Sequence, residues 1–311
     1  MTKAHIIFTI KLLAIILVLS YVLDKVIYYS LNKVSDTVYT GQAIGKLNHY
    51  LSVKDTTQVI AFGSSRANHH IDVRKLSKSS FNVGVDGKFI AYSSTLIKLL
   101  PKNKKQQIIL HIDPNVAFRK HYNRSEIKTL MVKYHRSPII KKELKKAEQE
   151  NPLQEFYWSI DYNGLVLGIL KNAVFPKYDH TNYSGYDPLH IGENDKEIFK
   201  KILERRDPLD CGENIKMNDL YLSYLKEIKT FCDENNKNLI LITSPLYVDD
   251  CPEDNLELAQ ILSELNITYY DYTNYFKDNN ALEYWKDLSH MSDVAANQFS
   301  ETLSKDLSLN E

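Results

Sequence analysis

The chain has 311 residues with 39 basic and 39 acidic side chains, and 43% of its residues are hydrophobic. That length is enough for one large or two small domains with a buried core, and the ordinary apolar content excludes a disordered chain. The zero net charge provides no basic field of the kind that attracts nucleic acid, so we expect no nucleic-acid partner.

The longest apolar run of the chain lies at its N-terminus. Residues 6–23 read IIFTIKLLAIILVLSYVL and carry one charge, Lys11. As a helix they would extend about 27 Å, close to the ~30 Å hydrocarbon core of a bilayer. A cleaved signal peptide and a buried soluble helix are the alternatives. We favour an uncleaved single-pass anchor within 1–35, because the following residues, DKVIYY, contain no small-x-small cleavage site.

The charges around this run indicate its orientation. Lys3 and Lys11 precede or open the run, whereas Lys25 at its far end is offset by Asp24. The positive-inside tendency therefore favours a cytoplasmic N-terminus. We expect residues 36–311 to form one extracytoplasmic domain.

Downstream of the anchor, short apolar runs alternate with helical patterns. After an amphipathic helix at 37–51, we expect strands at 58–62, 80–85, 107–112, 238–243 and 268–272, with helices at 88–100, 218–235, 255–265 and 294–307. This alternation predicts a parallel sheet with helices on both faces. Residues 118–216 show no convincing strand, and we interpret them as a helical insertion. Its tyrosines at 178, 183 and 186 either offer stacking surfaces for a sugar or pack locally.

The three cysteines do not form a recognisable metal or disulfide pattern. Cys211, Cys232 and Cys251 are too few and too widely spaced for a zinc cage or a disulfide framework. We expect three unpaired cysteines, with a bridge between Cys211 and Cys251 as the alternative. No metal or cofactor is implied.

Polar residues cluster after the predicted strands, where ligands of parallel α/β sheets bind. GSSR at 63–66 follows the first strand, and NVGVDG at 82–87 overlaps and follows the second. DPN at 113–115 follows the third strand, and DLSH at 287–290 opens the last helix. These are the residue types needed for acyl transfer at an activated serine.

Each of these residues has a distinct part in that chemistry. A serine hydroxyl such as that of Ser65 is a weak nucleophile near neutral pH and needs a general base. His290 can serve as the base, and Asp287 can orient its ring and stabilise the imidazolium. The developing oxyanion needs donors, which backbone N–H groups at Ser65 and Gly87 and the Asn115 amide can supply.

Taken together, the four motifs resemble those of the SGNH/GDSL hydrolase superfamily. GSSR corresponds to the family's Gly-Asp-Ser-Leu block, which makes Ser65 the nucleophile, and NVGVDG matches Asn-x-Gly-x-x-Gly with Gly87 at the oxyanion position. DPN keeps Asn115 of the Gly-x-Asn-Asp block, and DLSH matches Asp-x-x-His through Asp287 and His290. The resemblance covers 58–120 and 218–307. It implies a flavodoxin-like three-layer α/β/α sandwich with about five parallel strands and no cofactor.

Departures from the family blocks narrow the expected activity to one branch of the superfamily. Ser64 replaces the acidic residue and Arg66 the leucine, variants that resemble the membrane-anchored branch found beside bacterial surface-polysaccharide machinery. The resemblance therefore implies an esterase or O-acetyltransferase acting on an ester of a cell-surface glycan, with polysaccharide-assembly proteins as candidate partners. A catalytically silent scaffold that binds polysaccharide or an assembly partner is the alternative.

Further polar residues near the nucleophile admit two interpretations each. Arg66 can hold a carboxylate or phosphate of the substrate or form an ion pair within the protein. His69 is a candidate for lining the substrate cleft, although a solvated or capping role for His69 and His70 is the alternative, and no partner is spaced to complete a metal site. His111 is interpreted as a sheet histidine. Ser64 would be the nucleophile if the turn had a different register.

Overall fold

A computed structural model describes residues 2–209, 211 and 216–308. The chain divides into two compact units. Met1–Asn48 and Ile127–Tyr178 form one, here called the anchor unit, and His49–Glu126 and Asp179–Glu311 form the other, the sheet unit. The segment 118–216 is thus shared between the two units.

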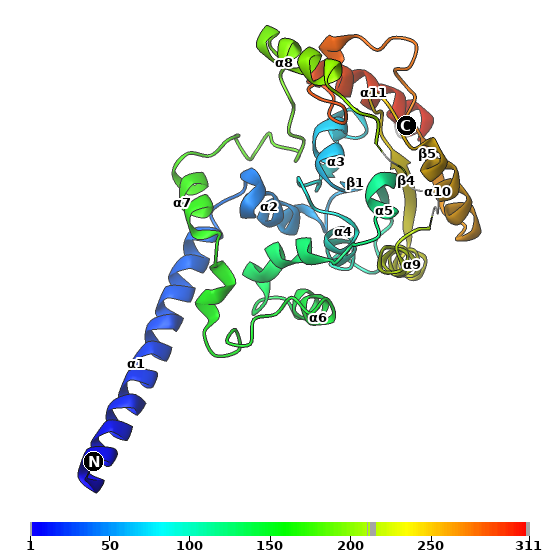
Figure 1. Ribbon diagram of the computed structural model, residues 1–311. Helices are drawn as coiled ribbons and strands as arrows, with labels where there is room; N and C mark the ends of the chain where they lie inside the picture. The colour runs from blue at the N-terminus through cyan, green and yellow to red at the C-terminus, as the bar shows by residue number, and fades with distance from the viewer. Residues whose placement is uncertain (1, 210, 212–215, 309–311) are drawn as a thin grey trace. The chain divides into compact units, whose positions relative to one another are not determined.

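Five parallel strands make the sheet of the sheet unit, in the order β2-β1-β3-β4-β5 (Figure 1). This is the order of flavodoxin-like doubly wound sheets, so the predicted α/β fold is confirmed. β1, β3 and β4 are largely buried because helices cover both faces of the sheet, whereas β5 lies at the edge and stays partly exposed. The strands are β1 Val59–Phe62, β2 Ser80–Asn82, β3 Gln106–His111, β4 Lys237–Thr243 and β5 Thr268–Asp271.

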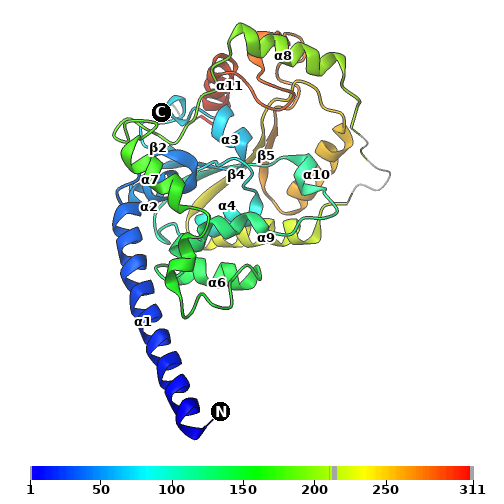
Figure 2. The ribbon, with the colours of Figure 1, turned by 60° about the vertical axis from the view of Figure 1, so that its left-hand side comes forward.

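Helices lie on both faces of this sheet. In both ribbon views α3 (Ser65–His70) and α11 (Asp293–Asp306) lie on one face, and α4 (Ile90–Ile97) and α9 (Asp219–Glu234) on the other (Figures 1 and 2). α10 (Pro252–Glu264) packs beside β5. The unit also contains η2 Val73–Lys75, α5 Pro114–Ala117, α8 Glu193–Glu204 and η5 Leu282–Tyr284.

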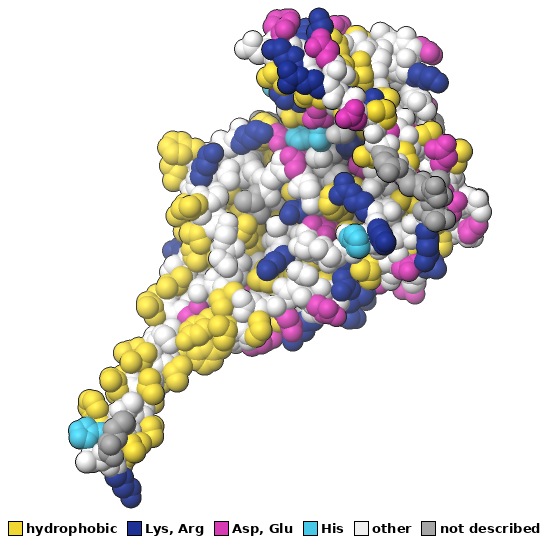
Figure 3. Space-filling model, in the orientation of Figure 1, with side chains coloured by type: hydrophobic (Ala, Val, Ile, Leu, Met, Phe, Trp, Pro, Cys, Tyr) yellow, Lys and Arg dark blue, Asp and Glu magenta, His cyan; other side chains and the backbone are white. Residues whose placement is uncertain are grey.

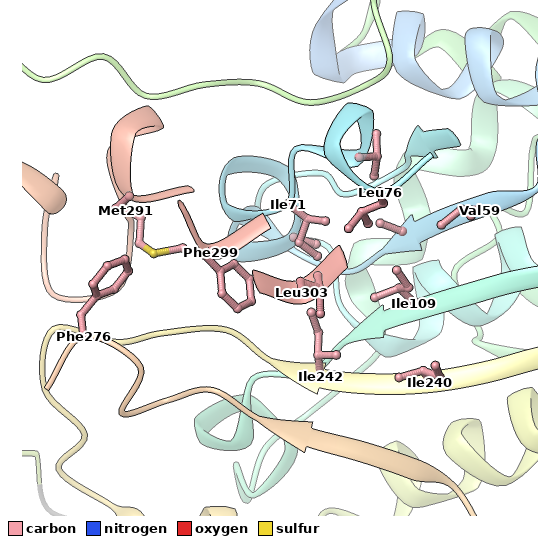
Figure 4. Close-up of a cluster of buried hydrophobic side chains, with 14 of the residues drawn as sticks. Val59, Ile71, Leu76, Ile109, Ile240, Ile242, Phe276, Met291, Phe299 and Leu303 are labelled. Atoms are coloured by element: carbon pink, nitrogen blue, oxygen red, sulfur yellow. The ribbon is translucent and has the colours of Figure 1, made fainter. Parts of the chain in front are cut away.

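The core under α3 and α11 follows from the strand period of two. Alternate strand residues such as Ile109 and Ile242 point to this face, where they pack in one buried cluster with Ile71 and with Phe299 and Leu303 of α11 (Figure 4). The apolar residues of α11 recur at helical spacing. The helix begins at its N-cap Ser292, whose hydroxyl accepts the Ala295 N–H.

A single long helix dominates the anchor unit. α1 runs from Lys3 to Ser35 and includes the whole predicted segment 6–23 as continuous helix. The apolar side chains of that segment are exposed, and Figure 3 shows them along the length of the helix. Among the described residues it is the one helix long and apolar enough to cross a membrane, and it suits a signal anchor or a signal peptide.

The amphipathic helix expected at 37–51 begins later than predicted. A π-helical turn, η1 Gly41–Gly45, leads into α2, Lys46–Val53. The buried Asn48 amide donates to the carbonyl groups of Ser35 and Val38, which holds the chain in a turn after α1. The other helices are η3 Ser125–Lys133, α6 Pro138–Lys146, η4 Trp158–Tyr162 and α7 Val166–Val174.

The cysteines differ from the favoured expectation. Cys211 and Cys251 form a disulfide, and Cys232 is free and buried. Cys251 is the N-cap of α10, and folding brings its Cα within 5.6 Å of that of Cys211, a normal separation for a bridge. Spacing along the chain carried no information on this proximity.

Candidate active site

Ser65 lies at the turn between β1 and α3. The preceding Gly63 has φ +143°, and a Cβ there would lie 2.8 Å from Ala67 Cβ and 2.9 Å from His111 Cβ. Glycine is therefore required for the chain to turn so tightly from sheet to helix. Ser65 is partly exposed at the start of α3, whereas Ser64 is only 6% exposed.

The structure brings Ser65, His290 and Asp287 together although 225 residues separate the first two. Ser65 Oγ lies 2.8 Å from His290 Nε2, a hydrogen-bond distance. His290 Nδ1 lies 2.9 Å and 3.0 Å from the two carboxylate oxygens of Asp287. A carboxylate only accepts, so Nδ1 carries the proton and Nε2 is left to accept from the Ser65 hydroxyl. This is the hydrogen-bond order of a nucleophile, its general base and the group that orients the base.

Asp287 also shapes the turn that carries His290. Its Oδ1 accepts the backbone N–H groups of Ser289 at 2.8 Å and His290 at 2.9 Å. Burial acts to raise the pKa of Asp287, but the hydrogen bond and charge of His290 together with the Ser289 donors lower it to about 2. The carboxylate is therefore ionised at neutral pH and can stabilise an imidazolium at His290.

A buried hydrogen-bond chain supports this turn from behind. The Met291 N–H donates to His70 Nε2 at 2.9 Å, so the His70 proton is on Nδ1, which donates to Ser244 Oγ at 2.7 Å. The Ser244 hydroxyl then donates to His111 Nε2 at 2.9 Å. His70 thus holds the residue next to His290 in place.

Sequence reasoning did not find this chain. His70 is completely buried, so the solvated interpretation of that residue is wrong. Burial, reinforced by the charge of Arg66, lowers the pKa of His70 and His111 well below the usual value, which keeps both rings neutral. Ser244 directly follows β4, and its place at a strand end is the signal that would have pointed to it.

Arg66 is buried inside the sheet unit. Only 1% of it is exposed. Its Nη2 donates to the Ser244 carbonyl oxygen, and its Nη1 lies 3.7 Å from Asp113 Oδ1. Of the two interpretations of Arg66, the structure shows the ion pair within the protein and no route to a substrate carboxylate or phosphate.

His69 is also buried, beside the ring of His290. The two ring centroids are 5.9 Å apart. His69 Nδ1 donates to the Asp187 carbonyl oxygen at 2.6 Å, and Nε2 lies 3.1 Å from the Asp86 carboxylate. Asp86 is half-exposed, whereas His69 is buried.

The predicted oxyanion donors lie in the loops after three neighbouring strands. Gly87 follows β2 with φ +67°, in a turn closed by the Lys88 N–H and the Val85 carbonyl, and the space where its Cβ would lie is open. Asn115 lies in α5 just after β3 and is partly exposed. Within the described ranges, neither the Ser65 and Gly87 N–H groups nor the Asn115 amide has a hydrogen-bond partner. All three remain available to a ligand.

Asn82, the first residue of the NVGVDG motif, holds the loop after β2 in place. Its amide donates to the carbonyl groups of Ala67 and Ile71 at 2.7 Å and 2.8 Å, and its Oδ1 accepts the Gly84 N–H. A Cβ at Gly84 would lie 2.6 Å from the Asn68 nitrogen. The motif therefore ties the loop after β2 to α3, and so to the loop that carries the nucleophile.

Two other expectations concern ligands away from the triad. Tyr183 and Tyr186 are buried, so they pack locally and offer no sugar-stacking surface. Tyr178 is partly buried.

Across the part of the chain that the structure describes, no cluster of three or more His, Cys, Asp or Glu side chains is arranged to hold a metal ion.

Comparisons with known proteins add no family to this description. No family model matches the chain, and no curated protein matches it. Its function is therefore inferred from the geometry of its side chains.

Proposed function

We propose that this protein is a membrane-anchored serine acyl-transfer enzyme of the SGNH type, an esterase or O-acetyltransferase that acts on an ester of an extracytoplasmic cell-surface glycan. One observation carries the proposal: the unbroken chain of hydrogen bonds from Asp287 through His290 to Ser65. Such a chain activates a hydroxyl that is otherwise a weak nucleophile.

The proposed reaction has two halves. Ser65 Oγ attacks the ester carbonyl as His290 Nε2 takes its proton, and the oxyanion receives hydrogen bonds from Ser65, Gly87 and Asn115. The intermediate then expels the alcohol, which takes the proton from His290 and leaves the acyl group on Ser65. Water or a sugar hydroxyl gives its proton to His290 and attacks the acyl carbonyl, and His290 then returns that proton to Ser65 Oγ as the bond to the acyl group breaks. Asp287 stays ionised throughout.

Two further features support the proposed location. The exposed apolar helix α1 has the length and composition of a membrane span. The bridge between Cys211 and Cys251 suits an oxidising compartment, because cytosolic thiols are kept reduced. The helix favours attachment to a membrane, and the bridge favours a sheet unit outside the cytoplasm.

A fluorophosphonate probe tests the proposal directly. The full chain, solubilised in detergent, should be labelled covalently at Ser65, and Ser65→Ala should abolish labelling. Ser64→Ala is the matched control, because the neighbouring hydroxyl is buried and makes no hydrogen bond to the triad. Labelling should persist in that variant.

An activity assay on the same solubilised protein then distinguishes an enzyme from a catalytically silent scaffold. Release of acetate from p-nitrophenyl acetate and from acetylated glycans, lost in Ser65→Ala, would support acyl transfer. A folded wild-type chain that neither reacts with the probe nor hydrolyses the activated ester would contradict it. That result would favour the silent polysaccharide-binding scaffold.

A further inference from the structure

A short loop of the anchor unit exposes apolar side chains beside α1. Residues 153–158 read LQEFYW and lead into η4, whose first residue is Trp158; we call them the collar. Leu153 is 58% exposed and Phe156 41% exposed. Hydrophobic side chains cover this part of the anchor unit as well as α1 (Figure 3). Exposed apolar side chains next to a candidate membrane helix mark a surface that contacts another protein or a membrane.

The collar is attached to α1 at the end of the apolar run. The rings of Phe156 and Tyr21 lie 5.0 Å apart, and the Tyr157 hydroxyl is 3.0 Å from Ser20 Oγ. Lys25 Nζ donates to the Phe156 carbonyl oxygen at 2.6 Å. These contacts fall on residues 20–25, and the apolar run ends at residue 23.

Asp24 fixes the collar at this level. Its buried carboxylate accepts the N–H groups of Trp158 at 2.8 Å and Ser159 at 3.0 Å, the first turn of η4, and also the Ser159 hydroxyl. The Tyr28 ring packs edge-on against Trp158, with 5.4 Å between centroids. The collar therefore cannot slide along α1 without breaking charge-assisted hydrogen bonds.

The position along α1 at which the collar is attached indicates what its apolar side chains contact. Ser20 lies three residues before the end of the apolar run, about 4.5 Å along the helix axis, so a spanning α1 places the collar at the headgroup boundary. Tyrosine and tryptophan are enriched at that boundary, where ring and polar tip face different surroundings. Lys25 Nζ lies 4.3 Å from the ring centroids of both Tyr21 and Trp158, a cation–π contact that ties the collar to α1.

We propose that the collar inserts its apolar side chains into the headgroup region of the bilayer, as a second membrane contact beside α1. The partner is the lipid surface, because the collar continues the apolar surface of α1 at interfacial depth. This contact would set the tilt of α1 and hold the anchor unit against the membrane. It does not depend on the proposed acyl-transfer activity.

Tryptophan fluorescence can measure the depth of the collar. The chain has two tryptophans, and Trp285 is fully buried in the sheet unit, so Trp285→Phe leaves Trp158 as the reporter. The full chain is reconstituted in phosphatidylcholine vesicles brominated either near the headgroup or near the chain ends. We expect a loss of Trp158 fluorescence that is larger with the shallow bromines.

A second variant calibrates the depth. Ile15 lies mid-run and is exposed, so Ile15→Trp in a Trp158→Phe, Trp285→Phe background should lose more fluorescence with the deep bromines. Trp158 unquenched by either lipid while the tryptophan at position 15 is quenched would overturn the proposal and point to a protein partner for the collar. No quenching at either position would overturn it as well, because α1 would then not insert.

Substitutions in the collar itself complete the test. Leu153→Ser with Phe156→Ser should reduce the quenching of Trp158 by the shallow bromines, since less apolar surface remains to enter the lipid. Circular dichroism and resistance to limited proteolysis report whether the double variant is folded. A folded double variant with undiminished quenching would show that these side chains do not hold the collar in the membrane.

Discussion

Replacing Asp287 with asparagine keeps the shape of that side chain but favours a proton on Nε2 of the proposed base, His290, in place of Nδ1. The new Oδ1 can keep the N–H groups of Ser289 and His290, which lie 2.8 Å and 2.9 Å from it in the wild type. The amide nitrogen then faces His290 Nδ1 and can only donate. An Nδ1 proton would then face this amide group at 2.9 Å, so the tautomer with the proton on Nε2 is favoured although Oδ1 stays 3.0 Å from Nδ1. With its proton on Nε2, opposite Ser65, His290 cannot accept the hydroxyl proton.

The size of the effect follows from the alternative to that tautomer. Turning the amide over to accept from His290 Nδ1 would leave two backbone N–H donors without their acceptor, at a cost of ~1–3 kcal/mol each. The sum of about 2–6 kcal/mol corresponds to a loss of kcat between about 30-fold and 10⁴-fold. We expect KM to change little, since Asp287 does not contact the ester. The assay is hydrolysis of p-nitrophenyl acetate by the full chain in detergent.

A second aspartate–histidine pair supplies the control. Asp293 Oδ2 lies 3.0 Å from His190 Nδ1 on the exposed surface, so Asp293→Asn makes the same chemical change away from Ser65. Its kcat should match that of the wild type. If folded Asp287→Asn also kept a wild-type kcat while Ser65→Ala lost activity, the tautomer argument and the role of Asp287 would be refuted.

Three other outcomes are expected. Asn115→Ala should lower kcat about 10²–10³-fold at nearly constant KM if its amide binds the oxyanion; an unchanged kcat would leave only backbone donors. The pKa of Asp287 falls from 3.8 to about 2 on folding, so its stabilising contribution is complete above 3.8 and lost as pH falls through 2; the difference in unfolding free energy between wild type and Asp287→Asn should shrink over that window. Cys251→Ser opens a bridge between residues 40 apart and should lower the free energy of unfolding by about 4 kcal/mol in urea titrations, with reductant reproducing the loss in the wild type but not in the variant.

Local patterns of the sequence determined the elements of this protein. Continuous apolar runs such as 59–62 and 239–242 become parallel strands because both their faces are buried. β2 ends three residues earlier than expected, at Asn82, because the Asn82 side chain bonds to loop groups and turns the chain. The apolar run at 6–23 likewise forms continuous helix, with most of its side chains exposed.

Only the tertiary structure decided which distant side chains meet and which are buried. Motif order placed Ser65 and His290 at strand and helix ends, but the 2.8 Å between them depends on how α3 and α11 pack on the sheet. Arg66 and His70 are ordinary polar residues in the sequence; packing encloses them, and enclosure requires internal partners. The partner of Cys211 is settled in the same way, because bridging depends on distance in space, which spacing along the chain does not report.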